Sequence, residues 1–404
     1  MELLWTLVSW ALSAHAVGVS TCCSQLHREL GIKSLQESGL NPACVMRPSV
    51  PQDVARAVSV IAGIDSCNFA IKGQGHAPAA GFANIEGSVT IDMTGLNTTT
   101  LSPDRSVVRV GAGATWLQVY RYLDPFNIAV AGGRNGLVGV GGLTLGGGIS
   151  HFSPRVGWAC DNVVNFEAFT DILSSSDFDI YTSLVTVFRY NSTSKSWAIS
   201  NSAVYTRPVL HPPVFAGLAT VPSISNSSRI TSLAFFADEA PTPPLNWLFA
   251  TVTLKPSTKF MLEVFDILNS TLYSVNPPGG VVWNIAFEPL PSVMFSQAAK
   301  TGGNVLGVRP EDGNSYIMLL SALWQDSAAN LVVEQASRRA ISSIESRARA
   351  KGLLRKFQYL NYAAPYQAPL KSYGAVEFGF LKGVSSKYDP LGLFKDRVPG
   401  GFKL

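Results

Sequence analysis

Charged residues are scarce in this chain, and neither sign is gathered into runs. Only 14% of the 404 residues are charged, and 31 Lys and Arg against 27 Asp and Glu leave a net charge of +4. A balance this weak and this dispersed gives no electrostatic footprint for nucleic acid. Hydrophobic residues make up 47% of the chain, so the composition predicts a globular protein with two or three packed domains.

The ligands and runs that other function classes need are also missing. The five histidines are scattered and no Cys-x-x-Cys pair occurs, so the sequence gives no support for a zinc site. After the N-terminal segment, no stretch is long and apolar enough to cross a membrane. A Rossmann unit is absent too, because the glycines of Gly73-Gln74-Gly75 run on into Pro78 and a loop instead of opening a helix. A nicotinamide dehydrogenase is therefore disfavoured.

The N-terminus carries a short apolar run that ends in Ala14-His15-Ala16, the small-x-small pattern of a signal-peptidase site. It predicts a signal peptide over residues 1–18, although Glu2 stands where basic residues are expected. A buried helix or an anchor is the alternative. Secretion agrees with the presence of four unblocked glycosylation sequons. They lie at Asn97, Asn191, Asn226 and Asn269.

Five cysteines follow this segment, at Cys22, Cys23, Cys44, Cys67 and Cys160. An oxidising compartment would let them pair, and an odd number leaves one over. Our first expectation is that Cys22 or Cys23 bonds Cys44.

Two glycine-rich loops stand out within residues 71–150. The first reads Lys72-Gly73-Gln74-Gly75-His76, and the second runs from Val138 to Ser150. Glycine lets the backbone approach a ligand closely, and successive N–H groups in such loops form cavities that bind anions. Either loop alone could be a tight turn in a β-rich domain. Together they suggest a cofactor with a pyrophosphate that is held from two sides.

The two loops in this order resemble the flavin-linked oxidoreductases of the vanillyl-alcohol-oxidase superfamily, in its berberine-bridge-enzyme-like branch, fungal type. Further matching segments lie along most of the chain. They are Ile91-Asp92-Met93, 110–116, Gly132-Gly133, 152–163, 359–362 and 387–390. The resemblance implies an α+β fold, with a two-subdomain PCMH-type FAD-binding domain and a substrate domain that has an antiparallel sheet with helices. It places the FAD domain at 19–170, the substrate domain at 171–356, and a segment returning to the FAD domain at 357–404.

Hydrophobic periodicity predicts the elements themselves. We expect helices at 22–30, 45–61, 116–123, 259–269 and 330–351. We expect strands at 69–72, 89–92, 107–110, 128–131, 184–188, 197–200, 248–254, 283–289 and 316–324.

FAD is the cofactor that the resemblance implies, bonded through His76 to the flavin 8α carbon. Some relatives add a cysteine bond at the position of Asn135, which cannot form it, so His76 should be the single attachment. Cys160 is expected to be structural, and Asp161 and Asn162 to hold the loop after the glycines. The residues expected to contact FAD are Gly73, Gln74, Gly75, His76, Ala77, Val138, Gly139, Gly141, Gly142, Thr144, Gly146, Gly147, Gly148 and Asn361.

The implied reaction removes a hydride from a carbon beside a hydroxyl, amine or phenol, passes it to flavin N5, and uses O₂ as the acceptor. Tyr362 is the candidate catalytic base, although a tyrosine with a pKa near 10 needs neighbours to act as one. A packing role for Tyr362 is equally compatible with the sequence, and Glu288 and Tyr366 are weaker candidates. The expected partners are a small molecule and O₂, and the protein is expected to be a monomer that serves secondary metabolism.

A part of the family's FAD domain is missing after Glu167, where its strands and flavin-contacting glycines should follow. Residues 168–177 read instead as the end of a helix from the substrate domain, and a smaller gap lies near 32–35. Both gaps resemble lost coding segments, and real divergence of the chain is the alternative. The second hypothesis is therefore an inactive secreted relative, either a pseudoenzyme or a truncated gene model, that does not hold flavin.

Overall fold

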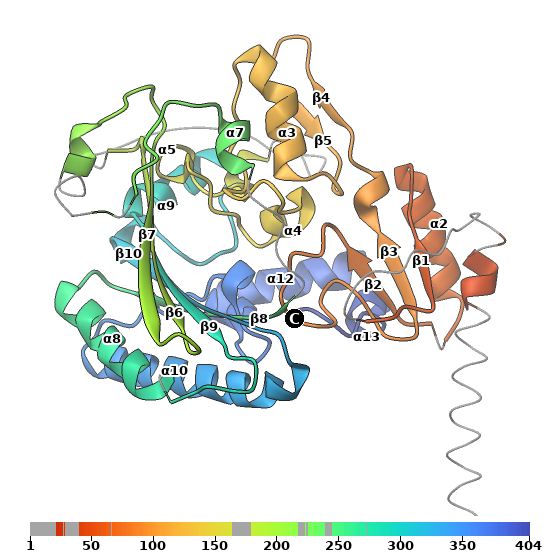
Figure 1. Ribbon diagram of the computed structural model, residues 1–404. Helices are drawn as coiled ribbons and strands as arrows, with labels where there is room; N and C mark the ends of the chain where they lie inside the picture. The colour runs from red at the N-terminus through yellow and green to blue at the C-terminus, as the bar shows by residue number, and fades with distance from the viewer. Residues whose placement is uncertain are drawn as a thin grey trace, which may run out of the picture. The chain divides into compact units, whose positions relative to one another are not determined.

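The computed structural model describes residues 22–26, 28, 40–65, 67–163, 179–216, 223, 225–238, 245–272 and 274–404. The backbone divides into two compact units (Figure 1). Unit 1 consists of Met1–Val119, Leu137–Gly142 and Phe380–Leu404, and unit 2 of Tyr120–Gly136 and Leu143–Gly379. The predicted signal peptide and both predicted gaps lie outside the described residues.

Unit 1 contains a three-stranded parallel sheet in the order β1-β3-β2. Its strands are β1 Cys44–Met46, β2 Phe69–Lys72 and β3 Val89–Asp92. Helix α2, Pro51–Ala62, buries Ala57 and Ile61 in a cluster with Phe69 and Ile91. The prediction of a helix from residue 45 was therefore wrong at its start. Residues 44–46 pair with β3 in extended form and bury their side chains, and Pro51 then occupies the first helical turn.

Two disulfides tie the start of unit 1 to its sheet. Cys23 bonds Cys44 in β1, which confirms the first pairing expected from the sequence, and Cys22 bonds Cys67 just before β2. Cys160 is the cysteine left over. The helical residues 22–26 are thereby fixed beside the buried cluster of the sheet.

The other elements of unit 1 are a two-stranded ladder and a C-terminal return. Strands β4 Thr99–Leu101 and β5 Val108–Val110 pair only with each other among the described residues. Residues 380–404, which include α13 Leu393–Asp396, return to β2: the Phe69 N–H donates to the Arg397 carbonyl oxygen at 2.9 Å. The rings of Phe69 and Phe394 also meet edge to face.

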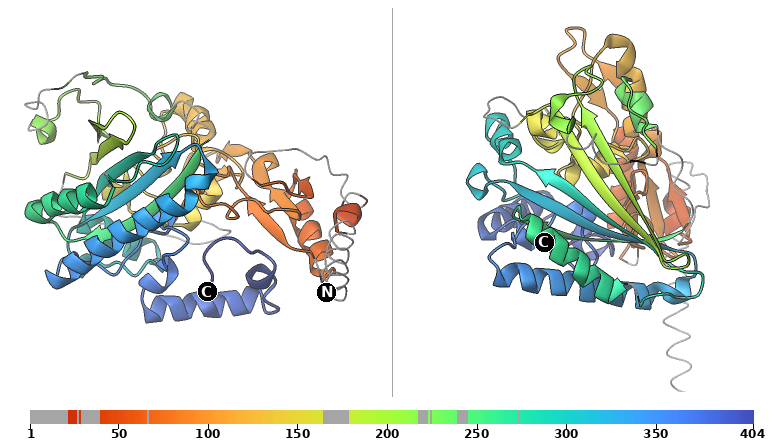
Figure 2. Two further views of the ribbon diagram at one scale, coloured as in Figure 1. Left: turned by 60° about the horizontal axis from the view of Figure 1, so that its bottom comes forward. Right: turned by 60° about the vertical axis from the view of Figure 1, so that its left-hand side comes forward.

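Unit 2 is built on a five-stranded antiparallel sheet in the order β7-β6-β9-β10-β8 (Figures 1 and 2). Its strands are β6 Thr182–Asn191, β7 Ser196–Tyr205, β8 Asn246–Leu254, β9 Val282–Leu290 and β10 Ser315–Trp324. Helices α8 Thr258–Leu272 and α10 Asn330–Ala350 pack on one face of it (Figure 2). These strands and helices are at the positions that the sequence predicted.

The two faces of this sheet differ in chemistry, because side chains alternate along each strand. In β9, Trp283, Ile285 and Phe287 join the hydrophobic core under α8 and α10. Asn284 and Glu288 lie on the opposite face, where Asn284 accepts a hydrogen bond from Arg189 and donates one to Ser321. The polar face therefore contains the candidate catalytic carboxylate.

Short elements connect these parts, and α3, Trp116–Leu123, has the bounds that the sequence predicted. The expected strand at 128–131 was wrong: these residues follow a 3₁₀ turn and form no ladder. The remaining elements are η1 Met93–Gly95, η2 Asp124–Phe126, α4 Val140–Leu145, α5 Ser153–Val156, η3 Cys160–Asn162, η4 Pro213–Phe215, α7 Leu233–Ala237, α9 Ser292–Ala298, η5 Ala299–Thr301, η6 Pro310–Asp312, η7 Ser327–Ala329, η8 Leu360–Tyr362, α11 Pro369–Ser372 and α12 Ala375–Tyr388. Within the described residues, no helix is both long and apolar enough to span a membrane.

Candidate active site

The first glycine loop follows β2, and its own backbone N–H groups donate to no described residue. Gly75 has a φ of +71°, which favours glycine, and the Gln74 side chain donates to the Gly113 carbonyl oxygen at 2.6 Å. Among the residues that the structure describes, none accepts a hydrogen bond from the N–H groups of residues 73–76. A run of free N–H groups on a loop held in place by a buried strand is an arrangement that can bind a phosphate.

The second loop packs directly against the first inside unit 1. A Cβ at Gly139 would lie 3.1 Å from the Gln74 backbone nitrogen, and one at Gly141 would lie 2.9 Å from the Ala112 carbonyl oxygen. The N–H of Val140 donates to the Ala114 carbonyl oxygen at 2.9 Å, which fixes the loop on the segment before α3. Gly73 and Gly142 face open space. The structure thus brings together the predicted loops at 73–77 and 138–142.

His76 lies at the exposed end of the first loop, beside Ala77. Desolvation by the protein around its ring lowers the pKa of His76 below 6.5, although the side chain as a whole remains exposed. The imidazole is therefore neutral at pH 7 and keeps a free lone pair, which a covalent bond to a carbon atom requires.

The remaining predicted glycines belong to unit 2, and Gly146 packs against Asn361. A Cβ at Gly146 would lie 1.9 Å from Asn361 Oδ1, and Gly147 and Gly148 have positive φ angles of 100° and 79°. Both N–H groups of the Asn361 amide are used, one by the Leu143 carbonyl oxygen and one by the Tyr359 hydroxyl, each at 3.0 Å. Thr144 is buried in the same turn, and its carbonyl oxygen accepts from the Gly147 N–H.

The segment after these glycines is held as the sequence predicted. The Asp161 carboxylate accepts from the Trp158 N–H at 2.9 Å and from Asn304 at 2.8 Å. Asn162 donates to the carbonyl oxygens of Val156 and Trp158. Burial, followed by the nearby Asp161 charge, raises the pKa of the Cys160 thiol, so this cysteine is an inert structural residue at neutral pH.

Tyr362, Glu288 and Arg134 form a closed network on the polar face of the sheet in unit 2. The Tyr362 hydroxyl donates to Glu288 Oε1 at 2.9 Å, and Arg134 Nη2 donates both to Glu288 Oε2 and to the Tyr362 oxygen at 2.8 Å. The Arg134 and Glu288 side chains are 17% and 5% exposed. The ring of Tyr362 is held edge-on by Tyr359 and Phe249.

Burial decides the protonation of this network. It raises the pKa of Tyr362 well above 10, and the Glu288 charge raises it further, whereas Arg134 opposes both. Desolvation is the largest influence on the pKa of Arg134 and lowers it, but Glu288 together with Tyr362 and Tyr359 outweighs desolvation, so the pKa of Arg134 is raised. The resting network therefore contains a neutral phenol and a charged guanidinium. Tyr362 cannot act as a free tyrosinate, so its proton needs an acceptor, and Glu288 is in contact with it.

The other candidates are separated from this network. The Tyr366 hydroxyl pairs with Ser337 Oγ of α10 at 2.9 Å, on the helix-covered side of the sheet. Asn135 follows Arg134, in the loop that Gly136 fixes by donating its N–H to the Ala237 carbonyl oxygen. Of the weaker candidates, only Glu288 contacts Tyr362.

Sequence reasoning missed two residues of this region, Arg134 and His151. His151 is 3% exposed; its Nδ1 lies 3.1 Å from Ser183 Oγ, while its buried Nε2 has no hydrogen-bond partner among the described residues. Burial, followed by the charge of Arg134, lowers the pKa of His151 to about 3. In the sequence, Arg134 can be noticed only as the single basic residue of the glycine-rich run 132–136. The sequence does not show that its partner is Glu288.

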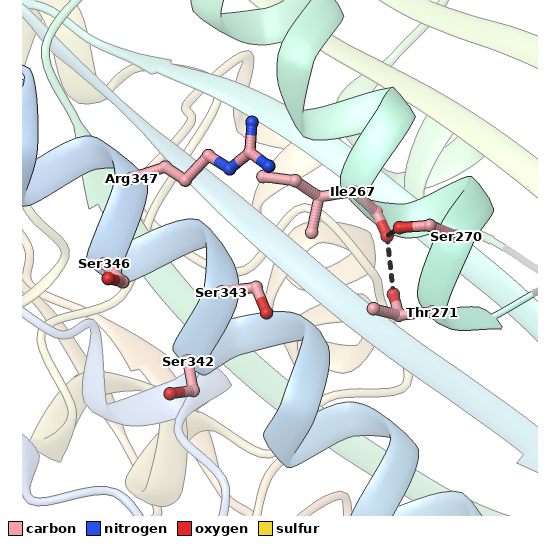
Figure 3. A pocket seen from close by; sticks show the side chains of 7 residues that line it. All are labelled: Ile267, Ser270, Thr271, Ser342, Ser343, Ser346 and Arg347. Carbon is pink, nitrogen blue, oxygen red and sulfur yellow. Dashed lines mark hydrogen bonds between the residues drawn. The ribbon is translucent and has the colours of Figure 1, made fainter.

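The surface features lie away from these groups. Asn97, Asn226 and Asn269 are exposed, whereas Asn191 is half-buried and its Oδ1 accepts from the N–H groups of Thr193 and Ser194. A pocket between α8 and α10 is lined by Ile267, Arg347 and five Ser and Thr side chains (Figure 3). The hydroxyls of Ser270 and Thr271 there donate to the carbonyl oxygen of Ile267 in their own helix, and no predicted site residue lines it.

Comparisons with known proteins agree with the predicted family and with the observed fold. The family described as "FAD binding domain" matches residues 42–171. An FAD-dependent monooxygenase of Cochliobolus heterostrophus is 30% identical, with 91% of this chain and 86% of that protein covered. The solved structure of 6-hydroxy-D-nicotine oxidase from Arthrobacter nicotinovorans has a TM-score of 0.67 at 16% identity, covering 91% of this chain and 93% of that one. A carbohydrate oxidase from Microdochium nivale has a TM-score of 0.63 at 15% identity, covering 94% and 98%. The expected fold is therefore confirmed.

The alignment with the Cochliobolus protein also measures what this chain lacks. It runs over 448 positions and covers 91% of the 404 residues, which is about 368, so about 80 aligned positions have no counterpart here. These positions are summed over the whole alignment, so the absence of a segment after Glu167 stays a prediction.

Proposed function

This chain belongs to the berberine-bridge-enzyme-like branch of the FAD-linked vanillyl-alcohol-oxidase superfamily, and we propose that it oxidises a C–H bond beside a hydroxyl or amino group of a small molecule, with O₂ as the final acceptor. FAD supplies the hydride acceptor of this reaction. The observation that carries the proposal is the pair of packed glycine loops in unit 1. The N–H groups of the first loop have no acceptor among the described residues, and the loop ends in the neutral His76.

The described residues fit the chemical groups of FAD. In unit 1, Gly73 and Gly142 leave open space where a pyrophosphate could approach, and the N–H groups of residues 73–76 have no protein acceptor. His76 would then form the single covalent attachment, since Asn135 offers no thiol. In unit 2, the Asn361 amide has both N–H groups engaged, which holds the turn that contains Gly146. The other glycines of the prediction would provide close backbone approach.

The chain's own contribution to the chemistry is proton removal. A substrate hydroxyl must lose its proton as its carbon is oxidised, and a positioned base accelerates such a step by about 10²- to 10⁴-fold. Tyr362 and Glu288 supply a hydroxyl and a carboxylate that share one hydrogen bond at 2.9 Å. Glu288 lies on the rigid β9 strand, so the pair is held in one geometry.

The test begins with the attachment. We would express the full chain through a secretory pathway, denature it and measure flavin fluorescence on the polypeptide in a gel. We expect fluorescence in the wild type, none in His76→Ala, and full retention in His211→Ala, which removes another exposed histidine. Fluorescence that persists in His76→Ala would place the attachment elsewhere.

The acceptor is tested with the flavin-loaded protein. An oxidase releases one H₂O₂ for each substrate oxidised and leaves no oxygen atom from O₂ in the product, so ¹⁸O₂ separates this reaction from a monooxygenase reaction. We expect H₂O₂ and unlabelled product. Labelled product would overturn the oxidase proposal and would agree with the activity named for the Cochliobolus protein.

A second candidate function is an inactive secreted relative. The observation that favours it is the absence of about 80 positions present in the alignment with the Cochliobolus protein, together with a β4–β5 ladder that has no further strand among the described residues. Short two-stranded ladders are of marginal stability. A soluble, folded and colourless protein would support this function and reject the oxidase.

The setting of the enzyme is part of the proposal. We propose secretion after removal of a signal peptide over residues 1–18, with glycans on the sequons. The two disulfides in unit 1 support an oxidising compartment. The proposed partners are a small molecule of secondary metabolism and O₂, and the proposed state is a monomer.

A further inference from the structure

Arg134 has no role in the reaction proposed above, and the sequence did not predict one. A single guanidinium nitrogen, Nη2, lies 2.8 Å from Glu288 Oε2 and 2.8 Å from the Tyr362 oxygen, and those two residues bond each other at 2.9 Å. Both side chains of the ion pair are largely removed from water. A buried ion pair of this kind is costly unless its geometry is good, and a closed ring of three hydrogen bonds meets that condition.

The Tyr362 oxygen has two distinct neighbours in this ring. It donates its proton to Glu288, and it accepts a hydrogen bond from a permanent cation. If the phenol proton moves onto Glu288, the phenolate that remains is paired with Arg134. The same guanidinium nitrogen also donates to Glu288 Oε2, so one cation contacts both members of the pair.

We propose that Arg134 is a positioning residue that turns Tyr362 and Glu288 into a proton relay for the oxidation. The relay rests on the proposed function. The substrate O–H bond breaks as a new Tyr362 O–H bond forms, and the original Tyr362 proton bonds to Glu288. The electron pair of the C–H bond leaves with the hydride of the proposed oxidation. Charge is conserved, since the proton ends on the carboxylate.

Two other titratable groups face this network, and both are neutral. Tyr359 contacts the Tyr362 ring edge to face, and its hydroxyl accepts from the Ile149 N–H and from Asn361. His151 is buried and uncharged above a pH of about 3. Phe249 supplies only apolar contact. A change in the pH profile above neutral pH therefore reports on Arg134, Glu288 and Tyr362.

The first test compares the pH dependence of kcat in the wild type, Arg134→Gln and Arg134→Lys. Without the cation the phenolate is unsupported, so we expect Arg134→Gln to lose about 10- to 100-fold in kcat at pH 7, part of the 10²- to 10⁴-fold that a positioned base provides. Its rate should recover toward higher pH. Lysine keeps the charge but loses the planar donor geometry. We therefore expect the kcat profile of Arg134→Lys to rise at nearly the same pH as that of the wild type, with only part of the wild-type rate. Added guanidinium should partly rescue Arg134→Ala.

The matched control is Arg121→Gln. Arg121 also forms an ion pair, with Asp238 at 2.6 Å, but both side chains are exposed. Exposed pairs contribute little, so this variant should keep the wild-type rate and profile. A wild-type profile in Arg134→Gln, equal to that of the control, would overturn the relay.

The second test is independent of oxidase activity. Infrared spectra detect the carbonyl stretch of a protonated buried carboxyl group. We expect none from Glu288 in the wild type at pH 7, and a band in Arg134→Gln that disappears in the double variant with Glu288→Gln. This measurement needs only folded protein. A wild type without flavin would reject the proposed function, whereas an unchanged spectrum in Arg134→Gln would reject only the role of Arg134.

Discussion

At the scale of single residues, Gly146 is a glycine of the predicted site whose replacement the structure disfavours. Its Cβ would fall 1.9 Å from Asn361 Oδ1, and the Asn361 amide is fixed by two hydrogen bonds. The side chain would have to move and leave buried partners unsatisfied, at a cost of about 1–3 kcal/mol. We therefore expect Gly146→Ala to lower the free energy of unfolding by that amount, as measured by denaturant titration.

Gly142→Ala is the matched control for this substitution. Its Cβ would meet no atom within 4 Å, and the residue lies in α4. Alanine in a helix is favoured over glycine by up to about 1 kcal/mol, so this variant should be neutral or more stable. Equal losses in both variants would contradict the packing described for Gly146.

His151 makes a prediction about pH. Its native pKa of about 3 lies below the ordinary value of 6.5, so the native state binds fewer protons than the unfolded chain between these values. This contribution to stability is complete above about pH 6.5 and is lost as the pH falls toward 3, at up to about 1.4 kcal/mol per pH unit. In His151→Gln, the fall in unfolding free energy between pH 7 and pH 5 should be smaller than in the wild type. His211→Gln, at an exposed position, should leave the fall unchanged, and a wild-type fall in His151→Gln would refute the burial of a neutral imidazole.

At the scale of elements, α10 shows how far periodicity can be read. The helical spacing predicted an amphipathic helix over 330–351, and the structure has Asn330–Ala350 with Val333, Ala340 and Ile344 in the core. The strand expected at 128–131 does not form. A short apolar run after a turn does not show whether a partner strand is present. Likewise, Cys44–Met46 became a strand because β3 offers a parallel partner.

Helix α10 also provides a stability test. Ile344 is fully buried under the sheet, so Ile344→Ala should cost about 2–5 kcal/mol of unfolding free energy. Leu331, on the same helix, is 65% exposed, and Leu331→Ala should remain within about 0.5 kcal/mol of the wild type. Similar losses in both would mean that α10 does not present this face to the sheet.

At the scale of the whole molecule, the cysteines report on folding and on the compartment. Four cysteines are paired and Cys160 is free. Alkylation of the secreted protein in denaturant without a reductant should therefore modify one thiol per chain, and Cys160→Ser should leave none. Full reduction should expose all five. Three modified thiols in the unreduced wild type would show that one of the two disulfides does not form.

The sequence by itself determined the cofactor class through its family resemblance, and it contained the two glycine loops. Residue spacing determined the five sheet strands and the helices α8 and α10 of unit 2, because these depend on local residue types. The cysteines narrowed one disulfide to Cys22 or Cys23 with Cys44. Only the tertiary structure decided which groups meet. It showed that the Gln74 loop and the Gly139 loop are in contact, that Tyr366 faces α10, and that Glu288 accepts the hydrogen bond of the Tyr362 hydroxyl. Arg134 lies 154 residues from Glu288 and 228 from Tyr362 in the chain. No spacing rule connects such residues, because their contact depends on how a loop and a sheet fold together.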